Sequence, residues 1–335
     1  MKVYEIEQAA GIDALRLTER AEPKPGPGQV LVTIKAVSLN YRDLVVVKGG
    51  HGRGLKLPLV PASDAAGEVT AVGEGVTRVR PGDRVAAIFM QSWVSGRLDA
   101  AGAASALGGA IDGVLAEQAV FGEQGLVRVP EHLSWEEAAT LPCAAVTAWN
   151  ALVVSGGIQP GDTVLTLGSG GVSVFALQFA KLSGAKVIAT SGSDEKLATL
   201  ESLGASHLIN YKKTPQWSKA VREATGGEGV DHVVEVGGAG TLEQSLRSVR
   251  LGGTVNLIGV LAGRGEFNPN WIFMKNIRVQ GIYVGSREMF EAMARAIAVN
   301  RLHPVIDRVF AFEQAREAMH YLESGAHLGK VVIRV

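Results

Sequence analysis

The feature that most constrains this chain is a predicted strand that leads through a tight glycine turn into an apolar helix. It reads Thr163-Val-Leu-Thr-Leu-Gly-Ser-Gly-Gly-Val-Ser173. Gly168 and Gly170 occupy the first two positions of G-x-G-x-x-G, where the absence of a Cβ lets the backbone approach a pyrophosphate. Ser173 replaces the third glycine and is small enough to pack close to the strand. The helix N-terminus would face the phosphates, although a glycine cluster is also typical of an ordinary turn. The predicted pyrophosphate contacts are Gly168, Ser169, Gly170, Gly171 and Val172.

Bulk properties restrict the remaining possibilities. A length of 335 residues suits two domains. Lys plus Arg and Asp plus Glu both number 33, so we expect no nucleic-acid partner. The N-terminal residues do not resemble a signal peptide, and the most apolar stretch, 138–154, is interrupted by polar residues and proline. We therefore expect a cytoplasmic protein without a membrane partner. The single cysteine, Cys143, excludes an intramolecular disulfide and an all-cysteine metal site.

The pattern of elements changes along the chain. Alternating residues in 30–37, 68–72 and 85–89, separated by Pro- and Gly-rich turns, predict a small twisted β-barrel-like domain. From Ser134, which forms a predicted capping box with Glu137, strands alternate with helices, which is typical of a parallel doubly wound sheet. The expected strands are 163–167, 186–190, 207–211, 231–236, 254–259 and 277–284. The expected helices are 172–183, 194–203, 215 to about 225, 240–249 and 287–300, and a strand-helix-strand unit spans 305–335.

The second strand of the predicted parallel sheet, residues 186–190, bears on the choice of cofactor. NAD-binding versions of the fold end this strand with an acidic residue that binds the ribose 2′-hydroxyl, whereas here the tip reads Ser191-Gly-Ser193. An Asp at this tip would repel a 2′-phosphate by up to roughly 4 kcal/mol per charge pair at about 4 Å. Ser191, Ser193 and Lys196 can instead bind phosphate, which favours NADP(H). In the alternative interpretation the serines only cap the helix and Lys196 is solvated.

Motifs spread along the whole chain make it resemble the zinc-free members of the medium-chain dehydrogenase/reductase superfamily, near the quinone oxidoreductases and enoyl reductases. The motifs are Asn40-Tyr-Arg-Asp43, Pro61-Ala-Ser-Asp-Ala-Ala-Gly67, 72–85, Leu141-Pro-Cys-Ala-Ala-Val-Thr-Ala-Trp149, the glycine turn and Gly329-Lys-Val-Val-Ile333. The resemblance implies an α/β chain that combines a Rossmann doubly wound parallel sheet with a GroES-like β-rich barrel. We expect the GroES-like domain at 1–125, completed by 301–335, and the Rossmann domain at 126–300.

The same resemblance predicts that no metal is bound. In zinc-dependent relatives a cysteine, a histidine and a second cysteine hold the metal, and an acid follows the histidine. The matching residues here are Asn40, Ser63 and Cys143, with Asp64 as the acid. A catalytic zinc needs three good protein ligands, and neither an amide nor a serine is one. We interpret Cys143 as a small residue beside the cofactor rather than as a nucleophile.

Without a metal, hydride addition to a carbon–carbon double bond conjugated to a carbonyl is favoured over alcohol oxidation, because hydrogen bonds can stabilise the enolate. Asn40 is the predicted polar anchor and Tyr41 the predicted hydroxyl donor, although a tyrosine here could simply pack. The related quinone oxidoreductases have tyrosines where this chain has Val45 and His51, so their substrate contacts do not transfer.

The resemblance also implies further cofactor contacts. Thr147 is expected near the nicotinamide, and Tyr211 beside the 2′-phosphate unless it only packs there. Lys330 would either reach a cofactor phosphate or be solvated. Gly237, Gly259 and Phe273, the last in the loop 270–275, are expected near the ribose and nicotinamide, although each also suits ordinary turn chemistry.

The predicted function is therefore an NADPH-dependent reductase of quinones, enones or enoyl thioesters. A small hydrophobic carbonyl compound is the expected substrate, and the resemblance implies a homodimer. Two alternatives remain open: a zinc-free NAD(P)-dependent alcohol dehydrogenase, and an NADPH-binding sensor or structural protein with little turnover.

Overall fold

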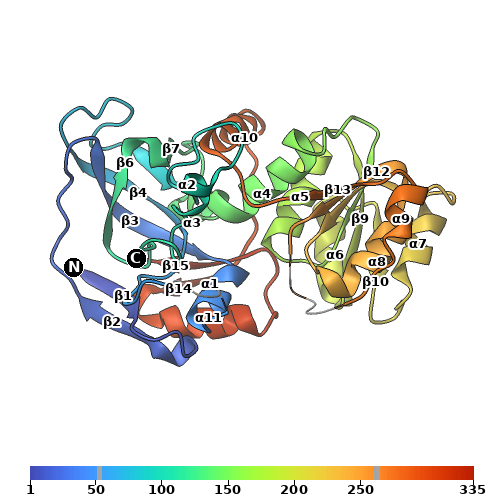
Figure 1. Ribbon diagram of the computed structural model, residues 1–335, viewed down its shortest axis with the longest axis horizontal. Coiled ribbons are helices and arrows are strands. Elements are labelled where there is room, and N and C mark those ends of the chain that lie inside the picture. Colours follow the sequence, from blue (N-terminus) through green and yellow to red (C-terminus); the bar gives the residue numbers. More distant parts are fainter. Residues whose placement is uncertain (51–54, 260, 262–264) are drawn as a thin grey trace. The chain divides into compact units, whose positions relative to one another are not determined.

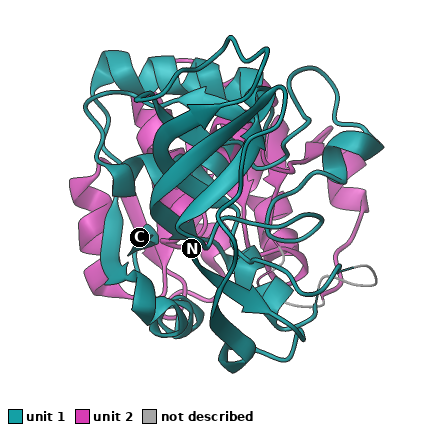
Figure 2. Cartoon of the chain, turned by 90° about the vertical axis from the view of Figure 1, so that its left-hand side faces the viewer, with its two compact units in different colours: residues 1–146, 285–335 teal, residues 147–284 magenta. Residues whose placement is uncertain are grey.

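The structure, a computed structural model, describes residues 1–50, 55–259, 261 and 265–335. His51 lies outside the described residues. The chain forms two compact units, residues 1–146 with 285–335 (unit 1) and residues 147–284 (unit 2), shown in Figure 2. The predicted domain limits, 125 and 300, differ from the unit bounds at 146 and 284. The division into domains that the limits describe stays a prediction.

Unit 2 is built on the predicted parallel doubly wound sheet. Its six strands lie in the order β10-β9-β8-β11-β12-β13, and every neighbouring pair is parallel. They are β8 (Thr163–Thr166), β9 (Lys186–Ser191), β10 (His207–Asn210), β11 (Val230–Glu235), β12 (Val249–Leu257) and β13 (Arg278–Gly281). The strand order reverses between β8 and β11, and ligands of such sheets bind at the carboxyl ends of the strands beside this reversal.

The four helices predicted in unit 2 are present (Figure 1), and the loop expected at 270–275 contains a further short helix, Asn270–Met274. The helices of unit 2 are α4 (Val146–Trp149), η4 (Asn150–Val154), α5 (Gly171–Leu182), α6 (Asp194–Ser202), α7 (Trp217–Ala224), α8 (Ala239–Ser248) and α9 (Asn270–Met274). The apolar side chains of β8, β9 and β11 pack with those of α7 and α8 in one core cluster, which includes Leu165, Val221 and Leu246.

Two strands of unit 2 differ from their predicted bounds by more than one residue. β12 begins five residues early because Val249 already pairs with Val230 before a register shift. The strand expected at 277–284 stops at Gly281, because its partner β12 ends at Leu257 and Val284 has a φ of 56°.

Unit 1 is organised around a mainly antiparallel sheet in the order β14-β15-β3-β4-β5-β7, in which β6 also pairs with β3. Its strands are β3 (Gln29–Leu39), β4 (Asp64–Val72), β5 (Arg84–Ala87), β6 (Gln118–Gly122), β7 (Leu126–Arg128), β14 (Ile306–Ala311) and β15 (Lys330–Arg334), and β1 (Lys2–Ile6) pairs with β2 (Leu15–Glu19). β15, from the C-terminal part of the chain, therefore lies beside β3 from the N-terminal part.

Helices connect the strands of unit 1. They are η1 (Ile12–Ala14), α1 (Tyr41–Val47), α2 (Ala100–Ala103), η2 (Glu123–Gly125), α3 (Trp135–Ala139), η3 (Leu141–Ala145), α10 (Arg287–Asn300), η5 (Phe312–Gln314) and α11 (Ala315–Glu323). The predicted capping box starts α3, since Ser134 Oγ accepts from the Glu137 N–H at 3.1 Å and Glu137 accepts from the Ser134 N–H at 2.7 Å. Within the described ranges, no helix is long and apolar enough to cross a membrane.

Candidate functional site

The glycine turn lies at the carboxyl end of β8, beside the reversal of strand order. Gly168 has a φ of 75°, which glycine adopts without strain, and its N–H donates to Thr190 Oγ1 at 3.2 Å. Gly170 is the N-cap of α5, and none of the described side chains caps this helix. The turn therefore presents a helix N-terminus with uncapped N–H groups, as the sequence predicts.

Ser173 shows why the third glycine is dispensable. Its side chain is buried, and its Oγ donates to the carbonyl oxygen of Leu167 at 2.6 Å. The hydroxyl thus ties the first turn of α5 to the end of the preceding strand. A serine at this position keeps the helix close to the sheet, so that the departure from the pattern costs little.

The tips of β9 and β10 bring the predicted phosphate residues together. Ser193 is the N-cap of α6 and accepts from the Lys196 N–H at 3.4 Å, while the buried Ser191 accepts from the Ser193 N–H at 3.3 Å. Ser193 therefore does cap the helix, as the alternative interpretation held, whereas Ser191 holds the N–H of the cap residue. Phosphate binding would be an additional role for both. A Cβ on Gly192 would lie 2.7 Å from the Tyr211 hydroxyl oxygen, which places that half-exposed ring over the strand tip.

Sequence reasoning missed two cationic residues at this tip. Lys212 Cε would lie 3.0 Å from a Cβ on Gly192, so the lysine stem lies alongside Tyr211. Lys213 forms an ion pair with Asp194, a carboxylate on the first turn of α6 whose pKa this pairing lowers. The run Tyr211-Lys-Lys213 directly after a predicted strand was the signal that could have found both.

Gly237 and Gly259 meet at the carboxyl ends of β11 and β12. A Cβ on Gly259 would lie 1.6 Å from the carbonyl oxygen of Val236, so only glycine permits this approach. The loop is fixed by Glu235, which sequence reasoning missed. Its buried carboxylate accepts from the N–H groups of Gly237 at 2.7 Å and Gly238 at 2.9 Å, and from two hydroxyl groups of α8.

The remaining predicted cofactor residues of unit 2 have contrasting environments. Thr147 is buried in α4, and Phe273 is 71% exposed on α9. Their roles beside a nicotinamide stay predictions.

In unit 1 a buried polar cluster forms where three neighbouring strands begin or end. β3 ends at Leu39, where β15 pairs it on one side and β4 on the other, through Val331↔Leu39 and Ser38↔Asp64. This register places Lys330 and Asp64 on opposite sides of the segment that leads from β3 to Asn40. All three side chains are buried.

Hydrogen bonds connect this cluster. Lys330 Nζ donates to Leu39 O and to Asn40 Oδ1, both at 2.6 Å. Asp64 accepts from Ser63 Oγ at 2.7 Å and from the Cys143 N–H at 3.0 Å. The structure thus gathers around Asp64 and Lys330 the three positions that sequence matching assigned to metal ligands. The alternative that Lys330 is solvated is wrong, because its side chain is 3% exposed.

Arg42 and Asp43 hold the adjoining loop. Asp43 Oδ2 accepts from the Asn40 N–H at 2.8 Å, and Arg42 Nη1 donates to Leu107 O at 2.9 Å. Tyr41, the first residue of α1, is 48% exposed. Its role as a hydroxyl donor stays a prediction.

Burial dominates the electrostatics of the cluster. It raises the pKa of Asp64, an effect that Lys330 opposes, and it lowers the pKa of Lys330, an effect that Asp64 opposes. Burial also raises the pKa of Asp43 to about 6, although Arg42 opposes it. Burial and the neighbouring Asp64 raise the pKa of the Cys143 thiol, so this side chain stays protonated. The cluster therefore combines one ammonium group, acidic side chains and a neutral thiol.

Comparison with known proteins shows where the chain belongs. Residues 26–131 match the family described as alcohol dehydrogenase GroES-like domain, and residues 171–299 match the zinc-binding dehydrogenase family. A zinc-type alcohol dehydrogenase-like protein of Schizosaccharomyces pombe is 47% identical over 98% of this chain and 97% of its own. This chain is a medium-chain dehydrogenase/reductase.

Other relatives of this medium-chain dehydrogenase/reductase have different activities in their names. The quinone oxidoreductase of Lama guanicoe is 29% identical over 99% of this chain and 97% of its own. A solved NAD-dependent alcohol dehydrogenase is 35% identical with a TM-score of 0.91, and the match covers 100% of both chains. Both parts of the predicted fold, the GroES-like domain and the parallel doubly wound sheet, are thereby confirmed.

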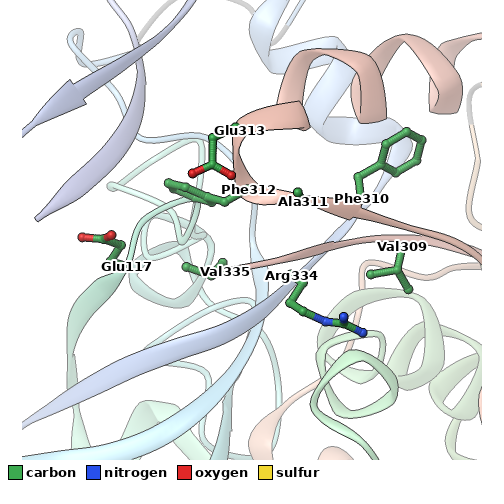
Figure 3. Close-up of a pocket in the computed structure, with 8 residues that line it drawn as sticks. All are labelled: Glu117, Val309, Phe310, Ala311, Phe312, Glu313, Arg334 and Val335. Atoms are coloured by element: carbon green, nitrogen blue, oxygen red, sulfur yellow. The ribbon is translucent and has the colours of Figure 1, made fainter.

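A separate pocket of this medium-chain dehydrogenase/reductase lies in unit 1, away from the predicted site residues. It has a volume of about 420 Å³, and its lining comes mainly from β14, the turn after it and the end of β15 (Figure 3). Glu117, Glu313 and Arg334 supply its charges, and Lys2 forms an ion pair with Glu313 at 3.5 Å. None of the residues predicted to bind cofactor or substrate lines it.

Proposed function

We propose that the protein is an NADPH-dependent reductase that adds hydride to a carbon–carbon double bond conjugated to a carbonyl, in a quinone, an enone or an enoyl thioester. The observation that carries this proposal is the buried cluster of Asn40, Asp64 and Lys330, which offers hydrogen-bonding groups where zinc-dependent relatives have metal ligands. An enolate oxygen needs such donors, whereas alcohol oxidation needs a stronger Lewis acid. The similarity to a quinone oxidoreductase supports the same choice.

The donor set of the cluster does not fit a zinc ion. Asn40 Oδ1 already accepts a hydrogen bond from the ammonium group of Lys330, and the Ser63 hydroxyl donates a hydrogen bond to Asp64. Of the three positions, only Cys143 could supply a thiolate, whereas a catalytic zinc needs three good protein ligands. Among the described residues no group of three His, Cys, Asp or Glu side chains is placed to hold a metal. We therefore propose zinc-free chemistry, in contrast to the names of some relatives.

The tip of β9 supports NADP(H) over NAD(H). Neither Ser191 nor Ser193 carries a charge that would repel a 2′-phosphate, and the carboxylate of Asp194 is paired with Lys213. Lys196, Tyr211 and Lys212 complete a set of donors at the same tip. The glycine turn and the start of α5 would hold the pyrophosphate.

NADPH, when bound, supplies the hydride that adds to the β-carbon of the substrate. The double-bond electrons then move to the carbonyl oxygen, and the resulting enolate takes a proton at its α-carbon. We assign Asn40 to hydrogen bonding with the enolate oxygen, and Tyr41 or solvent to supplying the proton. Contacts of Thr147, Gly237, Gly259 and Phe273 with the nicotinamide and ribose complete the proposed site.

Two measurements test this proposal. The ratio of dissociation constants for NADPH and NADH, measured by fluorescence titration, should favour NADPH, and a clear preference for NADH would overturn the cofactor assignment. NADPH consumption should occur with a panel of quinones, simple enones and enoyl-CoA. Turnover of simple alcohols alone would indicate an alcohol dehydrogenase, and tight NADPH binding without any turnover would indicate a binding protein. The homodimer and the cytoplasmic location stay proposals, and sedimentation tests the homodimer.

A further inference from the structure

The contact between Lys330 and Asn40 settles how the asparagine amide is oriented. An ammonium group has three donors and no acceptor, so the Asn40 atom 2.6 Å from Lys330 Nζ must be the oxygen. The two ends of an asparagine amide can otherwise be told apart only by such a partner. Lys330 therefore holds Oδ1 and directs Nδ2 to the opposite side.

The rest of Asn40 is equally restricted. Its N–H donates to Asp43 Oδ2 at 2.8 Å, and Leu39 before it lies in the ladder with β15 and also accepts from Lys330 at 2.6 Å. Rotation of the side chain would break its bond to the ammonium group. A single side-chain conformation is thereby selected.

This conformation leaves one donor unused. Asn40 Nδ2 is buried and carries two N–H groups. One is directed at Asp64, a hydrogen bond that lowers the pKa of that carboxyl, and the other has no acceptor among the described residues. Asp64 also accepts from Ser63 Oγ and the Cys143 N–H. A buried donor without a partner destabilises a fold, so its retention calls for a role other than stability.

We propose that Lys330 is a positioning residue, whose ammonium group fixes the Asn40 amide so that Nδ2 is presented to the oxygen of the substrate carbonyl. This inference rests on the proposed reductase function and names the residue that prepares its oxygen-binding donor. Lys330 acts through Asn40, whereas a lysine that bound the cofactor would act on cofactor affinity.

A double-mutant cycle on the full-length protein tests this coupling, with the substrate that turns over in the panel. Asn40→Ala should lower kcat by roughly a hundredfold, the loss measured when one oxyanion donor is removed. Lys330→Met should lower kcat less, and the double variant should be no slower than Asn40→Ala. The dissociation constant of NADPH should stay unchanged. The proposal would be overturned if the kcat of the double variant fell by the product of the two single losses. It would also be overturned if Lys330→Met bound NADPH more weakly but kept its kcat.

A measurement without turnover separates this inference from the proposed function. In the NMR spectrum of the ¹⁵N-labelled protein, the signal of the Asn40 side-chain amide is identified as the one that is missing from the spectrum of Asn40→Asp. This variant keeps a partner for Lys330. This signal should shift in Lys330→Met and stay in place in Lys24→Met, which changes an exposed lysine. An unshifted signal in Lys330→Met would refute the positioning role, even if the protein reduced enones.

Discussion

Asp64 and its neighbours show what single residues contribute to the candidate site. Motif matching placed Asn40, Ser63 and Cys143 at three ligand positions of one metal site, and the structure indeed gathers them around Asp64. The partner that decides their chemistry, Lys330, is 290 residues from Asn40 in sequence. No local pattern could predict that contact, because it depends on which strand lies beside β3.

Asp43 should give stability an unusual dependence on pH. Its pKa is raised by burial from 3.8 to about 6, so in that interval the folded protein binds more protons than the unfolded chain. The free energy of unfolding should therefore fall as the pH rises through this window, by about 3 kcal/mol at most. Asp43→Asn should flatten this dependence, as measured by urea unfolding at several pH values.

The matched control is Asp13→Asn, which changes an exposed carboxylate in the same unit and should keep the slope of the wild-type protein. If Asp43→Asn retained the full slope, the buried carboxyl would not be the group that titrates.

At the scale of elements, prediction succeeded where the signal is local. The capping box at Ser134 and the alternation of strands and helices in unit 2 were predicted from adjacent residues and are confirmed. The ends of β12 and β13 were not, because a strand ends where its neighbour ends, and that neighbour is distant in sequence. Glu235 was missed for a similar reason, since its partners appear only when α8 folds back on β11.

The junction of β11 and β12 provides a test at this scale. Gly259→Ala would place a Cβ 1.6 Å from Val236 O, so the loop that holds Gly237 must move. We expect a loss of roughly 1–3 kcal/mol in the free energy of unfolding. The dissociation constant of NADPH should rise as well, if this loop binds the cofactor as proposed. Chemical unfolding and fluorescence titration measure the two effects.

Gly281→Ala is the control, because it lies in the same sheet, has an ordinary φ and has no heavy atom near the added Cβ. Equal destabilisation by both substitutions would show that the close approach at Gly259 is not what requires glycine there.

At the scale of the whole molecule, the sequence predicted two kinds of architecture and the return of the C-terminal segment to the first sheet. The first follows from the periodicity of the elements, and the second was implied by the resemblance to the family. The assignment of residues 126–146 and 285–300 could not be predicted in the same way, because helices such as α10 carry no pattern that says which unit they pack with.

Metal content is a property of the whole protein, and the proposed absence of zinc can be tested directly. After dialysis against a chelator we expect no stoichiometric zinc by mass spectrometry, and an unfolding temperature equal to that before dialysis. The Cys143→Ala variant should have the same metal content, since we expect no zinc ion at this position for the thiol to hold. One retained zinc ion per chain would contradict the donor chemistry described for the cluster.

The position of β15 also affects how a ribosome can produce this protein. Residues 147–284 are synthesised before β15, so unit 2 can begin to fold while part of β3 still lacks its partner. Until β15 has been synthesised and has paired with β3, residues 36–39 present an open strand edge, the kind of surface on which nascent chains aggregate. Lys330 is part of β15. A chain whose synthesis stalls before β15 would therefore contain the parallel sheet of unit 2 but would lack the lysine of the polar cluster.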